Sequence, residues 1–180
     1  MEKSSIFDKT KYLLDPYAKA VVGQSVWGYK PPNGYQYRAR VVTNDFDWGK
    51  EKQPLIDMKD LIIYELHVRG FTAHASSNVS ARGTYAGIVE KIPYLKDLGI
   101  TAVELMPVTE FDEIMMSSSG SSFHNAKQEP TGYLNYWGYG PSYLYAVKTA
   151  YASRETMSAE GEFKTLVKEL HKAGIECIPE

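Results

Sequence analysis

The sequence predicts an α/β fold with a parallel sheet, because segments of buried-strand type alternate with segments of helical periodicity. The strand-type segments are residues 61–68, 100–106 and 175–178, which are short and almost continuously apolar. The helical segments, residues 88–98 and 163–170, repeat apolar side chains every three or four positions. This order is typical of parallel strands joined by outer helices. Two such units neither close a barrel nor cover both faces of a sheet, so we expect the chain to be an incomplete part of a longer protein.

The first 57 residues differ in character from the rest. They show no sustained period, and YKPPNG at residues 29–34 is a strong turn signal. Residues 35–42 alternate polar and apolar side chains and predict one short strand. We therefore expect residues 1–57 to form an extended arm or linker, and residues 58–180 to form the α/β part.

The first strand–helix unit carries clear boundaries. The apolar run at residues 61–68 predicts a strand buried on both faces. After a polar loop at residues 74–82, the helical spacing begins and ends at Gly99. Pro93 falls inside that pattern, so we expect a kink or a separate short helix there.

A long connection follows the second strand. Residues 109–158 contain a serine-rich, low-complexity stretch at 117–122, and we expect the first half to be disordered. The second half is rich in tyrosine and is expected to carry a short helix. The next helix presents an apolar face and closes at Gly174, and the third strand, buried like the others, begins at Ile175.

Composition narrows the class of protein. The formal net charge is −2, with 43% hydrophobic and 23% charged residues, which favours a globular protein and gives no case for binding nucleic acid or an anionic membrane. The sequence shows no signal peptide and no apolar run of bilayer length, so we expect a cytoplasmic location. The single cysteine, Cys177, is expected to be a small buried apolar residue.

The loops that follow parallel strands are the places where ligands bind in such folds. The second of these loops contains NYWGYGPSY at residues 135–143. Its aromatic faces could cover a sugar ring, while Gly138 and Gly140 let the backbone turn tightly. Alternatively, Tyr136 and Trp137 only pack the loop onto the sheet, and composition alone favours this second interpretation.

These stretches carry a resemblance to a known family. YELHVRGFT at 64–72, RGTYAGIVEKIPYLKDLGITAVELMPV at 82–108 and YWGYGPSYLYAVKTAYAS at 136–153 resemble the α-amylase superfamily, glycoside hydrolase family 13. LLDPYAKAVVG at 13–23 and EFKTLVKELHKAGIE at 162–176 are similar to the segments that flank them. The resemblance is strongest to the bacterial glycogen-debranching, isoamylase and pullulanase branch.

The resemblance implies a (β/α)₈ TIM barrel that cleaves α-1,6 branch linkages of glycogen, starch or pullulan with retention of configuration. In the family, a carboxylate nucleophile ends the fourth strand, a carboxylic acid ends the fifth, and a further aspartate follows the seventh. This sequence reaches only the third strand. We therefore expect no catalytic residue in it and no hydrolysis by it.

Two substrate-binding residues follow from the resemblance. Tyr139 matches the family tyrosine that stacks on the glucose at the cleavage subsite, and Trp137 matches the neighbour that shapes that loop; Pro107 matches a structural position. Gly140 departs from the Asn or Asp that is frequent in this branch. At the end of the chain, Pro179 and Glu180 replace the family's strand residues, and proline suits a central strand poorly.

Other residues invite functional interpretations with structural alternatives. Glu65 and Glu104 could form a carboxylate pair, but a hydrogen-bonded structural role inside the barrel is favoured. His67 and Arg69 could face the pocket, and pairing of Arg69 with loop carboxylates is the favoured role.

The acidic group of Glu110, Asp112 and Glu113 could bind Ca²⁺, but we expect a solvated loop, and His124 is expected to be a loop residue. The sequence contains no phosphate-binding glycine motif, metal-ligand cluster or serine or cysteine nucleophile motif. We therefore predict no cofactor and no metal.

Two further functions remain open at this point. The chain could be a non-catalytic glucan-binding or remnant protein that uses the loop around Tyr139, or part of a glucan branching enzyme. In each case the predicted partner is a branched α-glucan.

Overall fold

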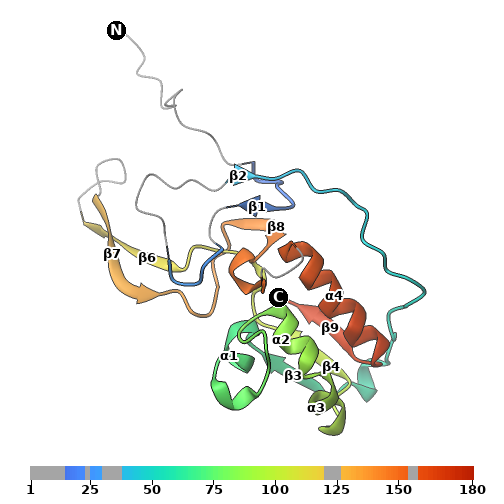
Figure 1. The fold of residues 1–180 in the computed structure, drawn as a ribbon. Coiled ribbons are helices and arrows are strands. Elements are labelled where there is room, and N and C mark those ends of the chain that lie inside the picture. The colour runs from blue at the N-terminus through green and yellow to red at the C-terminus, as the bar shows by residue number, and fades with distance from the viewer. Residues whose placement is uncertain (1–14, 23–24, 30–37, 120–126, 154–157) are drawn as a thin grey trace.

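The computed structural model describes residues 15–22, 25–29, 38–119, 127–153 and 158–180. Its centre is a parallel sheet in the order β3-β4-β9 (Figure 1). These strands are β3 (Ile63–Leu66), β4 (Ala102–Leu105) and β9 (Glu176–Pro179). All three strands predicted from the sequence are present, and both pairings are parallel, as predicted.

The helices lie along the connections between these strands. They are α1 (Val68–Thr72), α2 (Tyr85–Glu90), α3 (Ile92–Asp97) and α4 (Ala159–Lys172). The predicted break at Pro93 is confirmed: α2 ends before Lys91, and the proline lies in the first turn of α3, where its missing N–H is not needed. Short 3₁₀ turns add Met58–Asp60, Ala75–Ser77 and Thr149–Tyr151.

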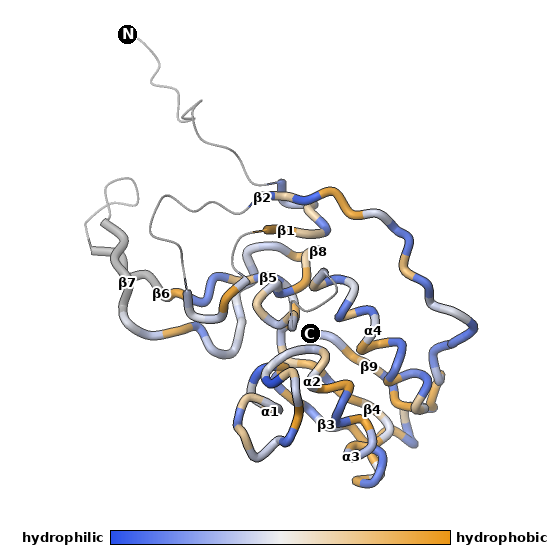
Figure 2. Tube along the Cα trace, in the orientation of Figure 1, coloured by the Kyte–Doolittle hydropathy of each residue, from blue (hydrophilic) through white to orange (hydrophobic). Residues whose placement is uncertain are grey.

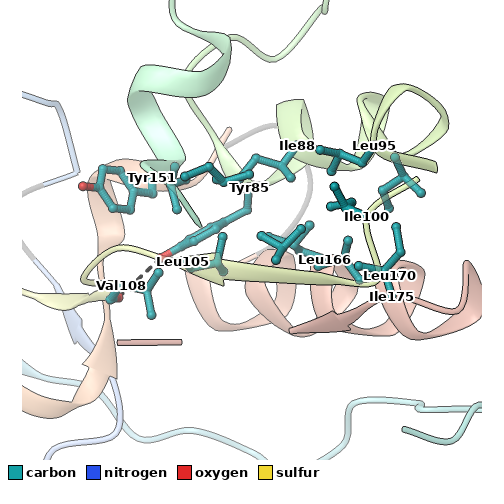
Figure 3. Close-up of a cluster of buried hydrophobic side chains, with 14 of the residues drawn as sticks. Tyr85, Ile88, Leu95, Ile100, Leu105, Val108, Tyr151, Leu166, Leu170 and Ile175 are labelled. Carbon is teal, nitrogen blue, oxygen red and sulfur yellow. Dashed lines mark hydrogen bonds between the residues drawn. The ribbon is translucent and has the colours of Figure 1, made fainter. Parts of the chain in front are cut away.

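The hydrophobic core fills the space between one face of the sheet and the helices (Figure 3). Leu105 of β4 is fully buried, as are Ile88 of α2 and Leu166 and Leu170 of α4. Each fully buried aliphatic side chain of this kind stabilises the fold by about 1.5–3 kcal/mol relative to exposure. Figure 2 shows apolar residues concentrated in β4 and β9, with hydrophilic residues interspersed along α4.

The opposite face of the sheet is open, which corrects the prediction of a first strand buried on both faces. Ile63 is 50% exposed, and Glu65 on the same face is also exposed. The apolar run does not reveal that its side chains alternate between two environments. Tyr64 and Leu66 pack on the core, whereas Ile63 and Glu65 meet no opposing layer among the described residues.

Strand β9 is an edge strand of the described sheet, and this explains how it accommodates Pro179. The backbone N–H groups of Glu176 and Glu180 donate to carbonyls of Thr101 and Leu105 next to β4. Alternate residues of a parallel strand face alternate sides, so the proline nitrogen lies on the open side and costs no hydrogen bond to β4. Cys177 is half-buried against the core, and burial raises the pKa of its thiol to about 12.

Within the connection at residues 109–158 the described residues form two strand pairs, so the prediction of a long, half-disordered loop is wrong for the described part. Of the serine-rich stretch, residues 117–119 lie in a strand, where antiparallel pairing satisfies their backbone groups. Residues 120–126, including His124, lie outside the described residues. The strands are β5 (Thr109–Glu110), which pairs with β8 (Tyr143–Val147), and β6 (Ile114–Ser119), which pairs with β7 (Lys127–Leu134). The expected short helix of the second half is the turn at Thr149–Tyr151.

The described part of the arm runs along the α/β part and is held to it at several points. It begins with β1 (Val21–Val22) paired with β2 (Arg38–Ala39), so the predicted strand at 35–42 is confirmed at residues 38–39. Further along, Arg40 forms an ion pair with Glu160 of α4. The backbone N–H of Ile56 donates to Glu176 of β9 over 3.1 Å. None of the described helices has the length and apolarity needed to cross a bilayer.

Candidate functional site

The tyrosine-rich loop lies over the C-terminal ends of the outer strands of the parallel sheet. The Trp137 ring meets the edge of His67, the residue that follows β3, with centroids 6.2 Å apart. The Tyr139 hydroxyl donates to Oε2 of Glu180, which follows β9, over 3.0 Å. Sequence reasoning placed this loop at the ligand-binding edge of the sheet, and these contacts put it there.

Two glycines and one asparagine set the shape of this loop. Gly138 and Gly140 have φ angles of +84° and +89°, a region that favours glycine. A Cβ on Gly138 would also lie 2.6 Å from a ring carbon of Phe111, so the backbone packs closely there. Asn135 accepts from the Gly138 N–H over 3.1 Å and donates to the Tyr139 carbonyl over 3.2 Å. The loop therefore holds its aromatic residues in a defined turn.

The aromatic residues of the loop divide between packing and exposure. Tyr136 lies flat on the His67 ring, with centroids 4.3 Å apart and planes 11° apart. Trp137 and Tyr139 are 55% and 58% exposed. Packing of the loop onto the sheet is thus mainly the role of Tyr136, whereas the two predicted substrate-binding residues present free ring surface.

His67 fixes the position of the loop. Its Nδ1 accepts the Gly70 N–H of α1 over 2.9 Å, so that nitrogen carries no proton. Its Nε2 therefore carries the proton and donates to the Tyr136 carbonyl over 2.7 Å, with the Tyr151 hydroxyl at 3.1 Å. Burial lowers the pKa of His67, opposed by the Tyr136 hydrogen bond and assisted by the charge of Arg69. The ring is neutral at neutral pH and serves as a fixed support.

An aromatic cluster beneath the loop includes a residue that sequence reasoning missed. Trp27 of the arm stacks on Tyr151 with centroids 5.7 Å apart and planes 15° apart, and its edge meets Tyr136. Arg69 lies over the Trp27 ring at 5.2 Å. The predicted pairing of Arg69 with loop carboxylates is therefore replaced by a cation–π contact. No spacing signal in the sequence could link Trp27 to residues more than 100 positions later.

Acidic side chains line the open face of the sheet below Tyr139. Glu65 and Glu104 are register partners on neighbouring strands. Glu65 is exposed and Glu104 is half-buried, and neither carboxylate makes a hydrogen bond to another described residue, so the expected hydrogen-bonded structural role is not observed. The hydrogen bond to Glu180 raises the pKa of Tyr139, with weaker contributions from desolvation and these carboxylates. The phenol is neutral, and because its proton is donated to Glu180, its oxygen can accept a hydrogen bond from a ligand.

A buried charge cluster lies where a solvated acidic loop was expected. Lys148, Glu110 and Glu113 are fully buried, and the Lys148 Nζ lies 2.6 Å and 2.7 Å from the two carboxylates. Thr149 donates twice to Glu110, at 2.8 Å and 2.6 Å. Burial raises the pKa of Glu110, although Lys148 and Thr149 oppose it. The prediction of a solvated loop is wrong because a buried lysine, far away in sequence, occupies the place between these carboxylates.

The fold and the loop together define a class: an α/β domain that presents aromatic side chains at the C-terminal edge of its parallel sheet. Residues 68–179 match the family model described as the α-amylase catalytic domain. The chain belongs to this family.

Relatives from several organisms indicate which branch of the family the chain resembles. The chain is 39% identical to isoamylase 1 of Arabidopsis thaliana, over 98% of the chain and 23% of that protein. It is 37% identical to a glycogen operon protein GlgX homologue of Mycobacterium tuberculosis, over 95% of the chain and 25% of that protein. An Anoxybacillus pullulanase solved with maltotetraose superposes with a TM-score of 0.65 and 28% identity, over 92% of this chain and 23% of that one. The similarity is therefore to the debranching branch, and the chain spans about a quarter of these relatives' length.

Proposed function

We propose that this chain is the part of an α-1,6-glucan debranching glycosidase that holds a glucose ring at the Trp137–Tyr139 loop. The observation that carries the proposal is the pair of exposed rings over the C-terminal edge of the sheet. Aromatic faces cover the C–H surface of a sugar, and the Tyr139 hydroxyl and neighbouring carboxylates suit its hydroxyl groups. The pullulanase neighbour solved with maltotetraose supports an α-glucan as the ligand.

Within this proposal the 180-residue chain binds glucan and does not hydrolyse it. Retaining hydrolysis needs two carboxyl groups about 5–5.5 Å apart on either side of the bond. Family resemblance assigns those groups to the fourth and fifth barrel strands, beyond the three parallel strands of the described sheet. We assign no catalytic role to Glu65 or Glu104. Both line the open face of the sheet below Tyr139.

We also propose the division into an arm at residues 1–57 and a partial (β/α)₈ barrel domain at residues 58–180. The support is that the described part of the arm contributes one short strand pair and reaches the rest of the chain through separate contacts of Trp27, Gly28, Arg40 and Ile56. The parallel sheet, by contrast, shares one core with the helices.

Affinity electrophoresis of the 180-residue chain through gels containing glycogen or pullulan tests the proposal. The wild type is expected to be retarded, and Trp137→Ala and Tyr139→Ala are each expected to weaken binding by about tenfold. Tyr94→Ala is the control, because that ring is 49% exposed on the outer helix α3. Equal retardation of all four proteins would show that the loop does not bind glucan.

Release of reducing ends from the same glucans tests the mechanistic part separately. We expect none from the wild-type chain. Hydrolysis that disappears in Glu65→Gln or Glu104→Gln would place the catalytic carboxylates in this chain and refute the assignment.

A further inference from the structure

A groove runs along the arm. Its lining residues come from elements other than the Trp137–Tyr139 loop. Its central part, about 390 Å³, lies between arm residues 42–44, Tyr145 of β8 and Glu160 of α4. Two further hollows also have Val42 in their lining, one of about 560 Å³ along α4 and one of about 320 Å³ beside Tyr17. We call these three neighbouring hollows together the arm groove. The volumes are those of small-molecule sites, which usually measure 300–1,000 Å³.

A buried carboxylate in the arm groove has one oxygen without a partner. Glu160 is only 8% exposed and lines both the central part and the part along α4. Its Oε1 is paired with the Arg40 guanidinium, whereas its Oε2 has no hydrogen-bond partner among the described residues. A buried acceptor left unpaired is costly, so this oxygen is suited to accept a hydrogen bond from a bound ligand.

Two tyrosines form an aromatic platform at one end of the groove. Tyr17 and Tyr145 lie 6.0 Å apart with planes 25° from parallel. They are 73% and 58% exposed, so both keep free ring surface. Such a platform suits a flat ligand with apolar C–H faces.

The polar groups along the groove favour a neutral ligand with many hydroxyl groups. Lys19 and Lys164 supply donors, Thr43 supplies a donor and an acceptor, and Glu160 supplies the unpaired acceptor. Charges of both signs lie together, so the groove offers no single-sign field for an anion or a cation. Adjacent hydroxyls of a sugar can bridge a carboxylate and an ammonium group while the ring stacks on the platform.

We propose that the arm groove is a second saccharide-binding site, in which an α-glucan segment stacks on Tyr17 and Tyr145 and donates a hydroxyl to Oε2 of Glu160. It uses no residue of the Trp137–Tyr139 loop. The choice of an α-glucan as the saccharide rests on the proposed function. Two sites on one chain would let it hold a branched polymer at two points, with a gain in apparent affinity.

Titration of the 180-residue chain with maltotetraose, followed by NMR or calorimetry, tests the second site. The wild type is expected to bind at two sites. Tyr17→Ala and Tyr145→Ala are expected to weaken one site by about tenfold and to leave the other unchanged. Both rings are largely exposed, so these variants are expected to fold like the wild type. Glu160→Leu is expected to remove the same site, with its fold checked by circular dichroism.

The variants separate the two proposals. If Trp137→Ala abolishes all binding and Tyr145→Ala changes nothing, the arm groove is refuted and the loop site stands. If Trp137→Ala retains one site that the further change Tyr145→Ala removes, the arm groove is supported. Absence of any binding by the wild type refutes both. Tyr94→Ala serves again as the control and is expected to bind like the wild type.

Discussion

At the scale of single residues, His67 connects the sheet to the candidate site. One nitrogen caps α1, the other holds the Tyr136 carbonyl, and the ring face supports Tyr136. Sequence reasoning suggested only that this side chain could face the pocket. The ring is buried, 7% exposed, and its role is to position the loop that carries Trp137 and Tyr139.

Replacing His67 by Phe keeps a flat ring but removes both hydrogen bonds. We expect a loss of about 1–3 kcal/mol in the free energy of unfolding at pH 8, because two part-buried hydrogen bonds are removed and each contributes about 0.5–1.5 kcal/mol. Urea denaturation measures this loss. His171→Phe, near the end of α4, is the control and is expected to change the free energy by less than about 0.5 kcal/mol.

Comparison of the wild type with His67→Phe at several pH values reports on the protonation of His67. Because the folded-state pKa of His67 is lowered, the neutral form is favoured in the fold. The stability it contributes is complete above the unfolded pKa of about 6.5 and is lost as pH falls through the lower folded pKa. The stability advantage of wild type over His67→Phe should therefore shrink as pH falls below 6.5. An advantage that stays constant between pH 8 and pH 4 would contradict the lowered pKa of His67 in the fold.

At the scale of elements, the β5–β8 pair is stabilised by a buried charge cluster in addition to apolar packing. Lys148 follows β8 directly and reaches the carboxylates of Glu110 and Glu113 on either side of Phe111. Glu113 also accepts the backbone N–H of Gly28, so the cluster ties the arm to the strands. The strands that carry the candidate loop thus depend on a buried ion pair with two acids.

Lys148→Met tests this dependence. It leaves two carboxylates buried without a cation, so we expect a loss of about 3–5 kcal/mol in the free energy of unfolding, measured by urea denaturation. Lys172→Met is the matched control, because its partner Glu169 lies at the surface of α4. Adding Glu110→Gln and Glu113→Gln to Lys148→Met should restore part of the loss. Similar effects of the two lysine changes would exclude a buried role for Lys148.

At the scale of the whole molecule, one face of the parallel sheet is uncovered. Ile63 on this face is 50% exposed, Ile62 just before the strand is 58% exposed, and the described sheet has an unpaired edge on both β3 and β9. Apolar surface and open strand edges of this kind promote association.

We expect the purified 180-residue chain to associate with rising concentration and to bind a hydrophobic dye, measured by light scattering and fluorescence. Ile63→Lys should reduce both effects, because it places a charge on the exposed edge strand. Leu98→Lys is the control, since that leucine is also 50% exposed but lies at the end of α3. A monomer with a single cooperative thermal transition at every concentration would contradict the prediction.

The alternation of strands and helices, the break at Pro93 and the place of the aromatic loop after the second strand can all be predicted from the sequence. These features depend on local periodicity and turn chemistry, which neighbouring residues carry. The family resemblance also came from sequence order, and the match over residues 68–179 confirms it.

Contacts between groups far apart in the sequence become visible only in the folded chain. Lys148 finds Glu110 and Glu113, Trp27 finds Tyr151, and Glu160 finds Arg40, although no periodicity relates them. The coverage of β3 on one face is also visible only there, because burial depends on what packs opposite and not on the strand's own residues. Local pattern fixes an element, whereas the partners that bury, pair or expose its side chains come from elsewhere in the chain.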